Sequence, residues 1–246
     1  LALRDWASLL TREIDLAANL IHRETGKPLS DATLEVALAI EHISWAGKFA
    51  PRILSRQNRP SGLLMFNLSA QVQRVPYGVV GVIGPWNYPM FTPMGSIAYA
   101  LAAGNTVVFK PSEFTPGVGK MLADSFNKIA KYSNVLQTIT GLGETGKALC
   151  ESAISKLAFT GSTRTAKLVA ETCAKNMIPV LLECGGKDPV LVDKDANIKL
   201  AAEYTIWSAM ANAGQSCIGA ERVYVHAKVA DKFQSAVLDI VKNLEP

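Results

Sequence analysis

The chain has 246 residues, 49% of them hydrophobic and 19% charged, and a formal net charge of +4. This length allows one large α/β domain or two smaller ones with a sizeable core, and the composition excludes a disordered chain. Lys and Arg form no run and no apolar stretch is long enough to span a membrane, so neither nucleic acid nor a membrane is an expected partner.

The N-terminal part is expected to form two helices followed by a ribbon. Apolar residues recur at helical spacing over residues 3–21, which predicts a helix that Gly26 and Pro28 end. A second helix is predicted over about residues 30–49. Residues 63–75 have extended, partly alternating character, which predicts a hairpin or a bridging ribbon.

From Tyr77 onward, short β-rich runs alternate with helical segments. The runs predict strands at residues 79–83, 106–109, 135–139, 156–159, 178–182 and 189–192. Helical patterns lie at residues 91–103, 115–130, 144–152 and 163–175. A helix to about residue 211, a strand at 222–226 and a helix from about 229 follow. The alternation indicates βαβ units around a parallel sheet, so the predicted fold class is α/β.

Polar or glycine-rich segments follow five of the predicted strands. They are "GPWNYP", "KPSE", "TGLGETG", "TGST" and "ECGGK". Ligands of open parallel sheets bind at the carboxyl ends of the strands. The arrangement is therefore typical of a nucleotide site.

Two of these segments compete as a phosphate site. "GLGETG" at residues 141–146 fits the GxGxxG dinucleotide pattern, with the pyrophosphate on the following helix, although a plain glycine turn would look the same. "FTGST" offers an alternative, because Gly161 and Ser162 open the next helix with unpaired backbone N–H groups.

Lys110 and Glu113 follow a predicted strand and have two interpretations. They could be a solvated charge pair before the next helix. They could also bind ribose hydroxyls, in which case the carboxylate would repel the additional phosphate of NADP.

Asn87, Glu183 and Cys217 are the candidates for chemistry. Asn87 lies between two prolines, and its amide suits an oxyanion donor. Glu183 directly follows an apolar strand, where we expect a carboxylate to be paired, protonated or functional because burying it unpaired is costly. Cys217 lies in "NAGQSCIGAE", among residues small enough to admit a substrate, whereas Cys184 is expected to serve packing.

The remaining cysteines and the histidines favour no other chemistry. Cys150 and Cys173 lie in predicted helices and are expected to be inert. The four cysteines show no CxxC spacing, and the three histidines are far apart without HExxH spacing. We therefore expect reduced thiols, a cytoplasmic location without a signal peptide, and no metal site.

Five ordered motifs together resemble the NAD(P)-dependent aldehyde dehydrogenase superfamily. They are "PWNYP", "KPSE", "FTGST", "LECGGK" and "AGQSC", and Cys217 lies 34 positions after Glu183. The resemblance implies a Rossmann-like cofactor domain followed by the beginning of an α/β catalytic domain. The parts implied are N-terminal helices at 1–57, a bridging or oligomerisation ribbon at 58–76, the NAD-binding domain at 77–185 and the start of the catalytic domain at 186–246.

The resemblance also implies a role for each candidate residue. Cys217 is the nucleophile, Glu183 the general base and Asn87 an oxyanion donor, while Lys110 and Glu113 bind the adenosine ribose. The other implied cofactor-binding residues are Ile83, Pro85, Trp86, Gly143 near the adenine, and Gly161 with Ser162 near the pyrophosphate. The resemblance therefore favours "FTGST" over "GLGETG" as the phosphate site. Ala166 departs from the glycine that is usual after "FTGST".

The resemblance makes the expected activity oxidation of an aldehyde to an acid with NAD, or with NADP, by a homodimer or homotetramer. Family members are roughly twice as long, so we expect this chain to be an incomplete fragment. Two other interpretations stay open. One is a CoA-acylating relative, which the presence of Glu183 argues against, and the other is a truncated homologue that only binds nucleotide or partners. The sequence texture is reminiscent of succinate-semialdehyde dehydrogenases, but it does not fix the aldehyde.

Overall fold

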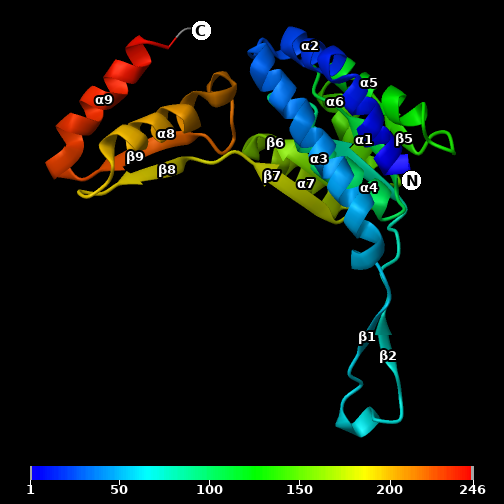
Figure 1. Cartoon of the computed structure of the whole chain (residues 1–246). Helices are drawn as coiled ribbons and strands as arrows, with labels where there is room; N and C mark the ends of the chain where they lie inside the picture. The colour runs from blue at the N-terminus through cyan, green and yellow to red at the C-terminus, as the bar shows by residue number, and fades with distance from the viewer. Residues whose placement is uncertain (1, 245–246) are drawn as a thin grey trace. The chain divides into compact units, whose positions relative to one another are not determined.

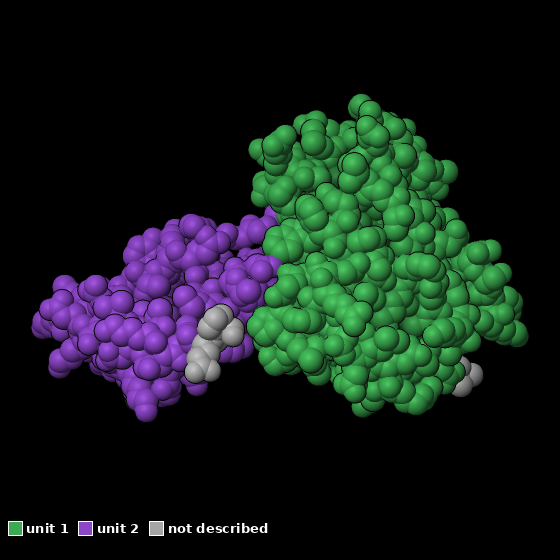
Figure 2. All heavy atoms as spheres, turned by 90° about the horizontal axis from the view of Figure 1, so that it is seen from above, with its two compact units in different colours: residues 1–183 green, residues 184–246 purple. Residues whose placement is uncertain are grey.

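The computed structural model describes residues 2–244, and the chain folds into two compact units, Leu1–Glu183 and Cys184–Pro246 (Figure 2). The first unit contains an open parallel sheet with helices packed on it, and the second contains a pair of strands with two helices. An α/β fold, as the sequence predicts, is therefore present. The finer division into four parts stays a prediction.

Three helices begin the first unit: α1 (Ala2–Arg12), α2 (Ile14–Thr25) and α3 (Leu29–Ile53). The prediction of one helix over residues 3–21 is wrong, because the backbone leaves helical geometry at Glu13, with φ −100° and ψ 17°. Gly26 ends α2 with φ 73°, a left-handed conformation that glycine adopts without strain. No helix within residues 2–244 is long and apolar enough to cross a membrane.

A hairpin follows α3. Strands β1 (Gln57–Arg59) and β2 (Ala70–Val72) pair in antiparallel orientation, so a hairpin is present, but only β2 lies within the predicted run of residues 63–75. The predicted extended run is interrupted by the 3₁₀ turn η1 (Leu63–Met65) between the strands. Apolar side chains are exposed at this turn, including Leu64 at 91%.

Five strands form the sheet of the first unit: β3 (Val79–Ile83), β4 (Thr106–Lys110), β5 (Leu136–Thr138), β6 (Lys156–Gly161) and β7 (Val180–Cys184). Their order is β5-β4-β3-β6-β7, and the pairs β3–β4, β3–β6 and β4–β5 are parallel. The connecting helices are α4 (Phe91–Ala102), α5 (Pro116–Asn127), α6 (Gly143–Glu151) and α7 (Thr163–Ala174) (Figure 1). Each predicted strand and helix from residue 79 to 184 is thus confirmed, with small shifts of its ends.

Alternate side chains of the sheet enter two separate cores, as the two-residue period of a strand requires. Val82 and its neighbour Phe109 belong to a core shared with α1–α5. Leu157 and Phe159 belong to a second core, which α6 and α7 complete. Helices therefore cover the central strands on both faces, so the strand exits are the accessible part of the sheet.

The second unit holds β8 (Asp188–Val192), α8 (Ile198–Met210), η2 (Ala211–Gly214), β9 (Ala220–Val225), η3 (Ala227–Val229) and α9 (Ala230–Lys242). The sequence pattern grouped residues 189–192 with the strands of one parallel sheet. That grouping is wrong, because β8 pairs in parallel with β9 in a separate two-stranded sheet. Val192, Ala202 and Phe233 form the small buried core of this unit.

Candidate active site

The carboxyl ends of β3, β4 and β6 lie side by side in the sheet. Ile83 is the register partner of Lys110 on one side and of Phe159 on the other. The Gly84 N–H donates to the Lys110 carbonyl at 3.0 Å, which holds the segment after β3 against the end of β4. Adjacent strand ends thus gather the segments that the sequence marks as candidates.

Lys110 is buried at this edge, with 4% of its surface exposed. Its Nζ donates to the Pro111 carbonyl at 3.1 Å. Burial lowers the pKa of Lys110, and the nearby charge of Glu113 opposes this shift. Glu113 itself is exposed, and its Oε2 accepts a hydrogen bond of 3.4 Å from the Ser112 hydroxyl. A buried ammonium and an exposed carboxylate therefore occupy one strand exit.

The glycines near this edge serve different purposes. Gly146 of α6 faces Lys110 and Ile83, since a Cβ there would lie 3.6 and 3.8 Å from their side chains. Gly143, at the start of α6, has no heavy atom within 4 Å of a Cβ position, so the space beside it is open. At Gly161, in contrast, a Cβ would lie 2.7 Å from the Phe159 ring, so this glycine makes room for the ring.

Ser162 is the N-cap of α7. Its Oγ accepts a hydrogen bond from the Thr165 N–H at 3.2 Å. Ile83 is buried and Pro85 half-buried, whereas Trp86 is 43% exposed. The structure therefore places all eight predicted cofactor-binding residues at or just beyond the ends of β3, β4 and β6, or at the start of α6.

A dinucleotide fits this donor set. An ammonium and a carboxylate can hydrogen-bond ribose hydroxyls, the N-termini of α6 and α7 favour negative charge, and Gly143 leaves open space. The role of each residue toward such a cofactor stays a prediction.

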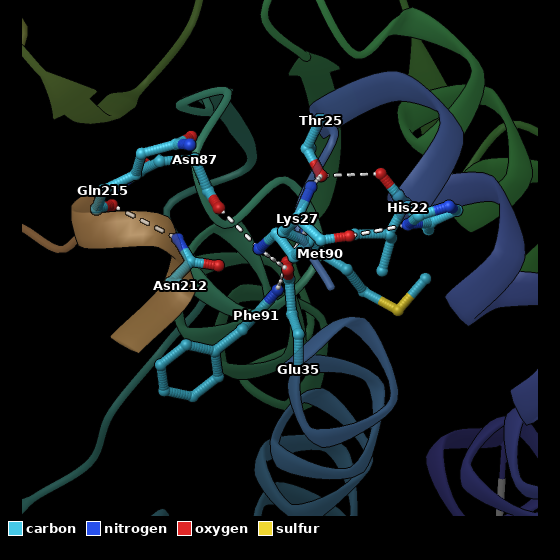
Figure 3. A network of polar contacts seen from close by, with 10 residues as sticks. His22, Thr25, Lys27, Glu35, Asn87, Met90, Phe91, Asn212 and Gln215 are labelled. Carbon is cyan, nitrogen blue, oxygen red and sulfur yellow. Dashed lines mark hydrogen bonds and ion pairs between the residues drawn. The ribbon is translucent and has the colours of Figure 1, made fainter. Parts of the chain in front are cut away.

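A buried ion pair that the sequence motifs do not predict holds the segment that carries Asn87. Lys27 Nζ donates to Glu35 Oε2 at 2.6 Å and to the Asn87 carbonyl at 2.6 Å (Figure 3). Glu35 Oε1 accepts the N–H groups of Met90 at 2.8 Å and Phe91 at 3.1 Å. Both charged side chains are fully buried. One signal was available, because Glu35 is the sole charged residue between residues 32 and 40.

The backbone of Lys27 is fixed by its neighbours. Its carbonyl accepts a hydrogen bond from His22 Nδ1 at 2.6 Å, and its N–H donates to the Thr25 hydroxyl at 3.3 Å (Figure 3). Lys27 therefore projects from a rigid corner between α2 and α3.

Glu183 is exposed, so the argument that burial would require the carboxylate to be paired, protonated or functional does not apply to it. The physical reason is that β7 is the last strand in the sheet order and has buried residues neither before nor after Glu183 within the strand. A carboxylate in this position is solvated and needs no partner, and its catalytic role stays a prediction.

The loop before Cys217 has an unusual backbone. Asn212, Ala213 and Gly214 follow one another with φ of 57°, 56° and 72°. Left-handed geometry costs an alanine roughly 1 kcal/mol, and such strain concentrates at functional sites. The strained turn thus marks the segment that presents the cysteine.

Cys217 is exposed. Its carbonyl accepts a hydrogen bond from the Gly186 N–H at 3.3 Å. A Cβ on Gly219 would lie 3.2 Å from the Ser216 carbonyl oxygen and 3.3 Å from that of Ser208. Some of the small residues around Cys217 are therefore required by close backbone packing, in addition to any room they leave for a substrate.

The other three cysteines differ in their exposure to solvent. Cys184 is exposed, so the expected packing role is wrong. Cys150 and Cys173 are buried, as predicted. Burial, with a contribution from Cys173, raises the pKa of the Cys150 thiol to about 12, which keeps it protonated and unreactive.

The three catalytic candidates lie in both units: Asn87 and Glu183 in the first and Cys217 in the second. Their convergence in one site stays a prediction.

Comparisons with known proteins agree with the motifs. A sequence model described as "Aldehyde dehydrogenase family" matches residues 1–246. The chain is 35% identical to a 4,4'-diapolycopene aldehyde oxidase of Methylomonas sp over 96% of this chain and 45% of the relative. It is 34% identical to a D-glyceraldehyde dehydrogenase (NADP(+)) of Picrophilus torridus over 96% of this chain and 48% of the relative.

A solved structure agrees as well. The crystal structure of an NAD-dependent aldehyde dehydrogenase from Sinorhizobium meliloti superposes with a TM-score of 0.93 at 31% identity, covering 99% of this chain and 48% of that one. The chain thus spans about half the length of the curated relatives it matches.

Proposed function

Because this chain belongs to the aldehyde dehydrogenase family, we propose that the whole protein oxidises an aldehyde to a carboxylic acid with NAD or NADP. The observation that carries the proposal is the exposed Cys217 at the end of a strained turn, in a chain that the family matches over its whole length. A nucleophile must be reachable by its substrate, and Cys217 meets that condition.

Cys217 begins the reaction. Its thiolate adds to the aldehyde carbon and forms a thiohemiacetal, and the resulting oxyanion accepts hydrogen bonds from the Asn87 amide and the Cys217 N–H. The oxyanion then reforms a carbonyl as a hydride leaves the carbon, and the acyl group remains on Cys217 as a thioester. The nicotinamide, when bound, takes up that hydride.

Glu183 completes the turnover as a general base. Its carboxylate takes a proton from water, and the hydroxide adds to the thioester carbon. The carbon–sulfur bond breaks, which releases the acid and returns Cys217 to the thiolate. The exposure of Glu183 supports this role, because water reaches the carboxylate.

The sheet edge of the first unit would hold the cofactor. Lys110 and Glu113 would bind the adenosine ribose, and Gly161 with Ser162 would lie near the pyrophosphate. Gly143 would face the adenine. The carboxylate of Glu113 favours NAD over NADP by charge repulsion. The named relatives include an NAD-dependent and an NADP-dependent enzyme, so the family permits either cofactor.

The substrate class is an aldehyde, aliphatic or aromatic. The hairpin at residues 57–72 would serve assembly into a homodimer or homotetramer. The exposure of Leu63 at 88%, Leu64 at 91% and Phe66 at 84% supports this, because a large apolar patch usually marks an interface.

Nicotinamide reduction by the whole protein over an aldehyde panel tests the proposal. Cys217→Ala is expected to abolish turnover, while Cys184→Ala, a matched exposed thiol, leaves it within about twofold. Glu183→Gln is expected to accumulate an acyl adduct that intact mass detects on Cys217. Normal turnover by Cys217→Ala contradicts the mechanism. A strict requirement for CoA identifies the CoA-acylating alternative.

A further inference from the structure

The Lys27–Glu35 ion pair takes no part in the mechanism proposed above, yet it is fully buried. The other ion pairs of the described residues are at least partly exposed, as in Lys120–Asp124, whose side chains are 72% and 54% exposed. Surface pairs of that kind form readily and contribute about 0–1 kcal/mol. A pair with no exposure requires a separate explanation.

The pair fixes both ends of residues 87–91, the segment called the Asn87 segment here. The Lys27 ammonium binds its first carbonyl, that of Asn87, at 2.6 Å. The Glu35 carboxylate binds the N–H groups of Met90 and Phe91 at 2.8 and 3.1 Å. Met90 is the N-cap of α4 and makes no side-chain capping bond, so Glu35 supplies the cap from another helix.

Aromatic contacts hold the middle of the segment. The Lys27 Nζ lies 4.4 Å from the centroid of the Tyr88 ring, within the range of a cation–π contact. The Tyr88 ring meets the Phe91 ring edge-on at 6.2 Å. Lys27 and Glu35 therefore contact the backbone at both ends of the segment, and Lys27 also contacts one of its rings.

Stability alone does not account for this pair. Burial lowers the pKa of Lys27 and raises the pKa of Glu35, and the mutual attraction of the two groups opposes both shifts. Removing two charges from water is so costly that well-packed apolar side chains in their place are often equally or more stabilising. The explanation that remains is that the pair orients the Asn87 segment, because hydrogen bonds of charged groups fix direction as well as distance.

We propose that Lys27 and Glu35 are positioning residues that set the orientation of Asn87 for the reaction. The inference rests on the proposed function of Asn87 as an oxyanion donor. The Asn87 side chain is attached to the same residue backbone whose carbonyl accepts the hydrogen bond from Lys27. Rotation of the peptide unit that contains this carbonyl therefore displaces the side-chain amide of Asn87. Oxyanion donors must lie within about 0.5 Å of their productive place, and a shift of about 1 Å can cost 100-fold in rate.

The first arm of the test measures kinetics on the whole protein. Lys27→Met is expected to lower kcat by about 10- to 100-fold with KM for the aldehyde changed by less than about threefold, because binding does not use the oxyanion. The double variant Lys27→Met/Glu35→Gln leaves no unpaired buried charge and serves if the single variant folds poorly. Lys120→Met, from the exposed pair, is the matched control and is expected to be unchanged.

A double-mutant cycle with Asn87→Ala separates positioning from a general structural role. When Asn87 is already truncated, Lys27→Met is expected to lower kcat by less than about twofold more, because its effect passes through the missing amide. Equal losses in both backgrounds overturn the assignment. Protection of the buried thiols Cys150 and Cys173 from an alkylating reagent gives the folded fraction, to which each rate is normalised.

The second arm does not depend on activity. Hydrogen exchange by mass spectrometry of the peptide covering residues 85–95 is expected to become at least about tenfold faster in Lys27→Met and to stay unchanged in Lys120→Met. Unchanged exchange in Lys27→Met overturns the inference even if the enzyme is active. Absence of turnover in the unsubstituted protein instead contradicts the proposed function, so the two failures are distinguishable.

Discussion

The two units differ in the exposure of their cysteines. Cys150 and Cys173 lie on α6 and α7 of the first unit and are buried in a core against the sheet. Cys217 lies in a loop of the second unit and is exposed, as is Cys184, the last residue of β7, at which the second unit begins. Whether a thiol is buried or open to reagents thus depends on the element that carries it. This difference in exposure alone distinguishes structural cysteines from candidate nucleophiles.

The units also differ in how they hold polar groups. The first unit fixes residues 87–91 with a buried ion pair and a large core around it. The second unit has a small core and keeps three consecutive left-handed residues before Cys217. The first unit therefore holds residues 87–91 rigidly, whereas the second unit has a strained backbone close to its exposed thiol.

The largest expected effect is on the rate of thiol labelling. At pH 7, iodoacetamide is expected to modify Cys184 and Cys217 of the native chain and to modify Cys150 and Cys173 at least about 1,000-fold more slowly, because labelling of a buried thiol requires local opening. Peptide mass spectrometry over a time course measures each rate. Cys184→Ala is the control and removes one fast site only.

The contrast should persist in alkali. The pKa of Cys150 is about 12 in the folded chain against an ordinary value of 9.0, so the native thiol stays protonated where the unfolded thiol ionises. The stabilising effect of this shift is fully present below pH 9 and is lost as the pH rises toward 12. Fast labelling of Cys150 at pH 9 under native conditions would contradict the assignment of this thiol as buried and unreactive.

Core truncation tests the difference in packing and has the next largest effect. Phe109→Ala is expected to lower the free energy of unfolding by about 3–5 kcal/mol, because the ring is 1% exposed and lies between the strands and helices of the large core. Phe233→Ala is expected to cost about 3 kcal/mol, at the low end of the same range, because the core that holds this ring has only three buried residues among those described. Urea unfolding measures both losses.

Hydrogen exchange assigns each loss to its unit. Phe109→Ala should speed exchange in residues 79–138 and Phe233→Ala in residues 188–242. Phe114→Ala is the control, because this ring is 66% exposed and its loss should change stability by less than about 0.5 kcal/mol. A greater loss of stability for Phe233→Ala than for Phe109→Ala would show that the size of the core does not determine how much stability a buried ring contributes.

The sequence predicts those features that short-range patterns encode. The runs at residues 79–83 and 106–109 are strands because β-branched residues recur within five positions, and glycine or proline bounds them. The segments after these strands therefore fall at one sheet edge. The same local reasoning placed Lys110 and Glu113 correctly at the end of β4 and beyond it.

Features that depend on distant partners were not predictable in this way. The contact of Lys27 with the Asn87 carbonyl joins residues 60 positions apart, and nothing near residue 27 encodes it. The partner of β8 is β9, because strand pairing is decided by the whole fold and not by the run itself. The exposure of Glu183 follows from the place of β7 at the end of the sheet order.

The smallest effect is expected for the loss of a helix cap. Each unit has a helix whose N-cap side chain accepts a hydrogen bond from a backbone N–H, so the same kind of interaction can be removed from both. Ser162 Oγ accepts from the Thr165 N–H and Asn197 Oδ1 accepts from the Leu200 N–H, each at 3.2 Å. Replacing either residue with alanine leaves one N–H of the first helical turn without its side-chain acceptor. Ser162→Ala and Asn197→Ala are both expected to cost about 1 kcal/mol, measured by urea unfolding.

Cofactor binding then distinguishes the two caps. In the whole protein, Ser162→Ala is also expected to weaken NAD binding by about 3- to 10-fold, whereas Asn197→Ala leaves it unchanged, because the predicted pyrophosphate site uses only the first cap. Titration calorimetry with NAD measures the difference, and Ser162→Asp, which keeps a capping oxygen but adds negative charge, should restore stability and weaken binding further. Equal NAD affinity in all three variants would remove Ser162 from the cofactor site and leave it a cap of the same kind as Asn197.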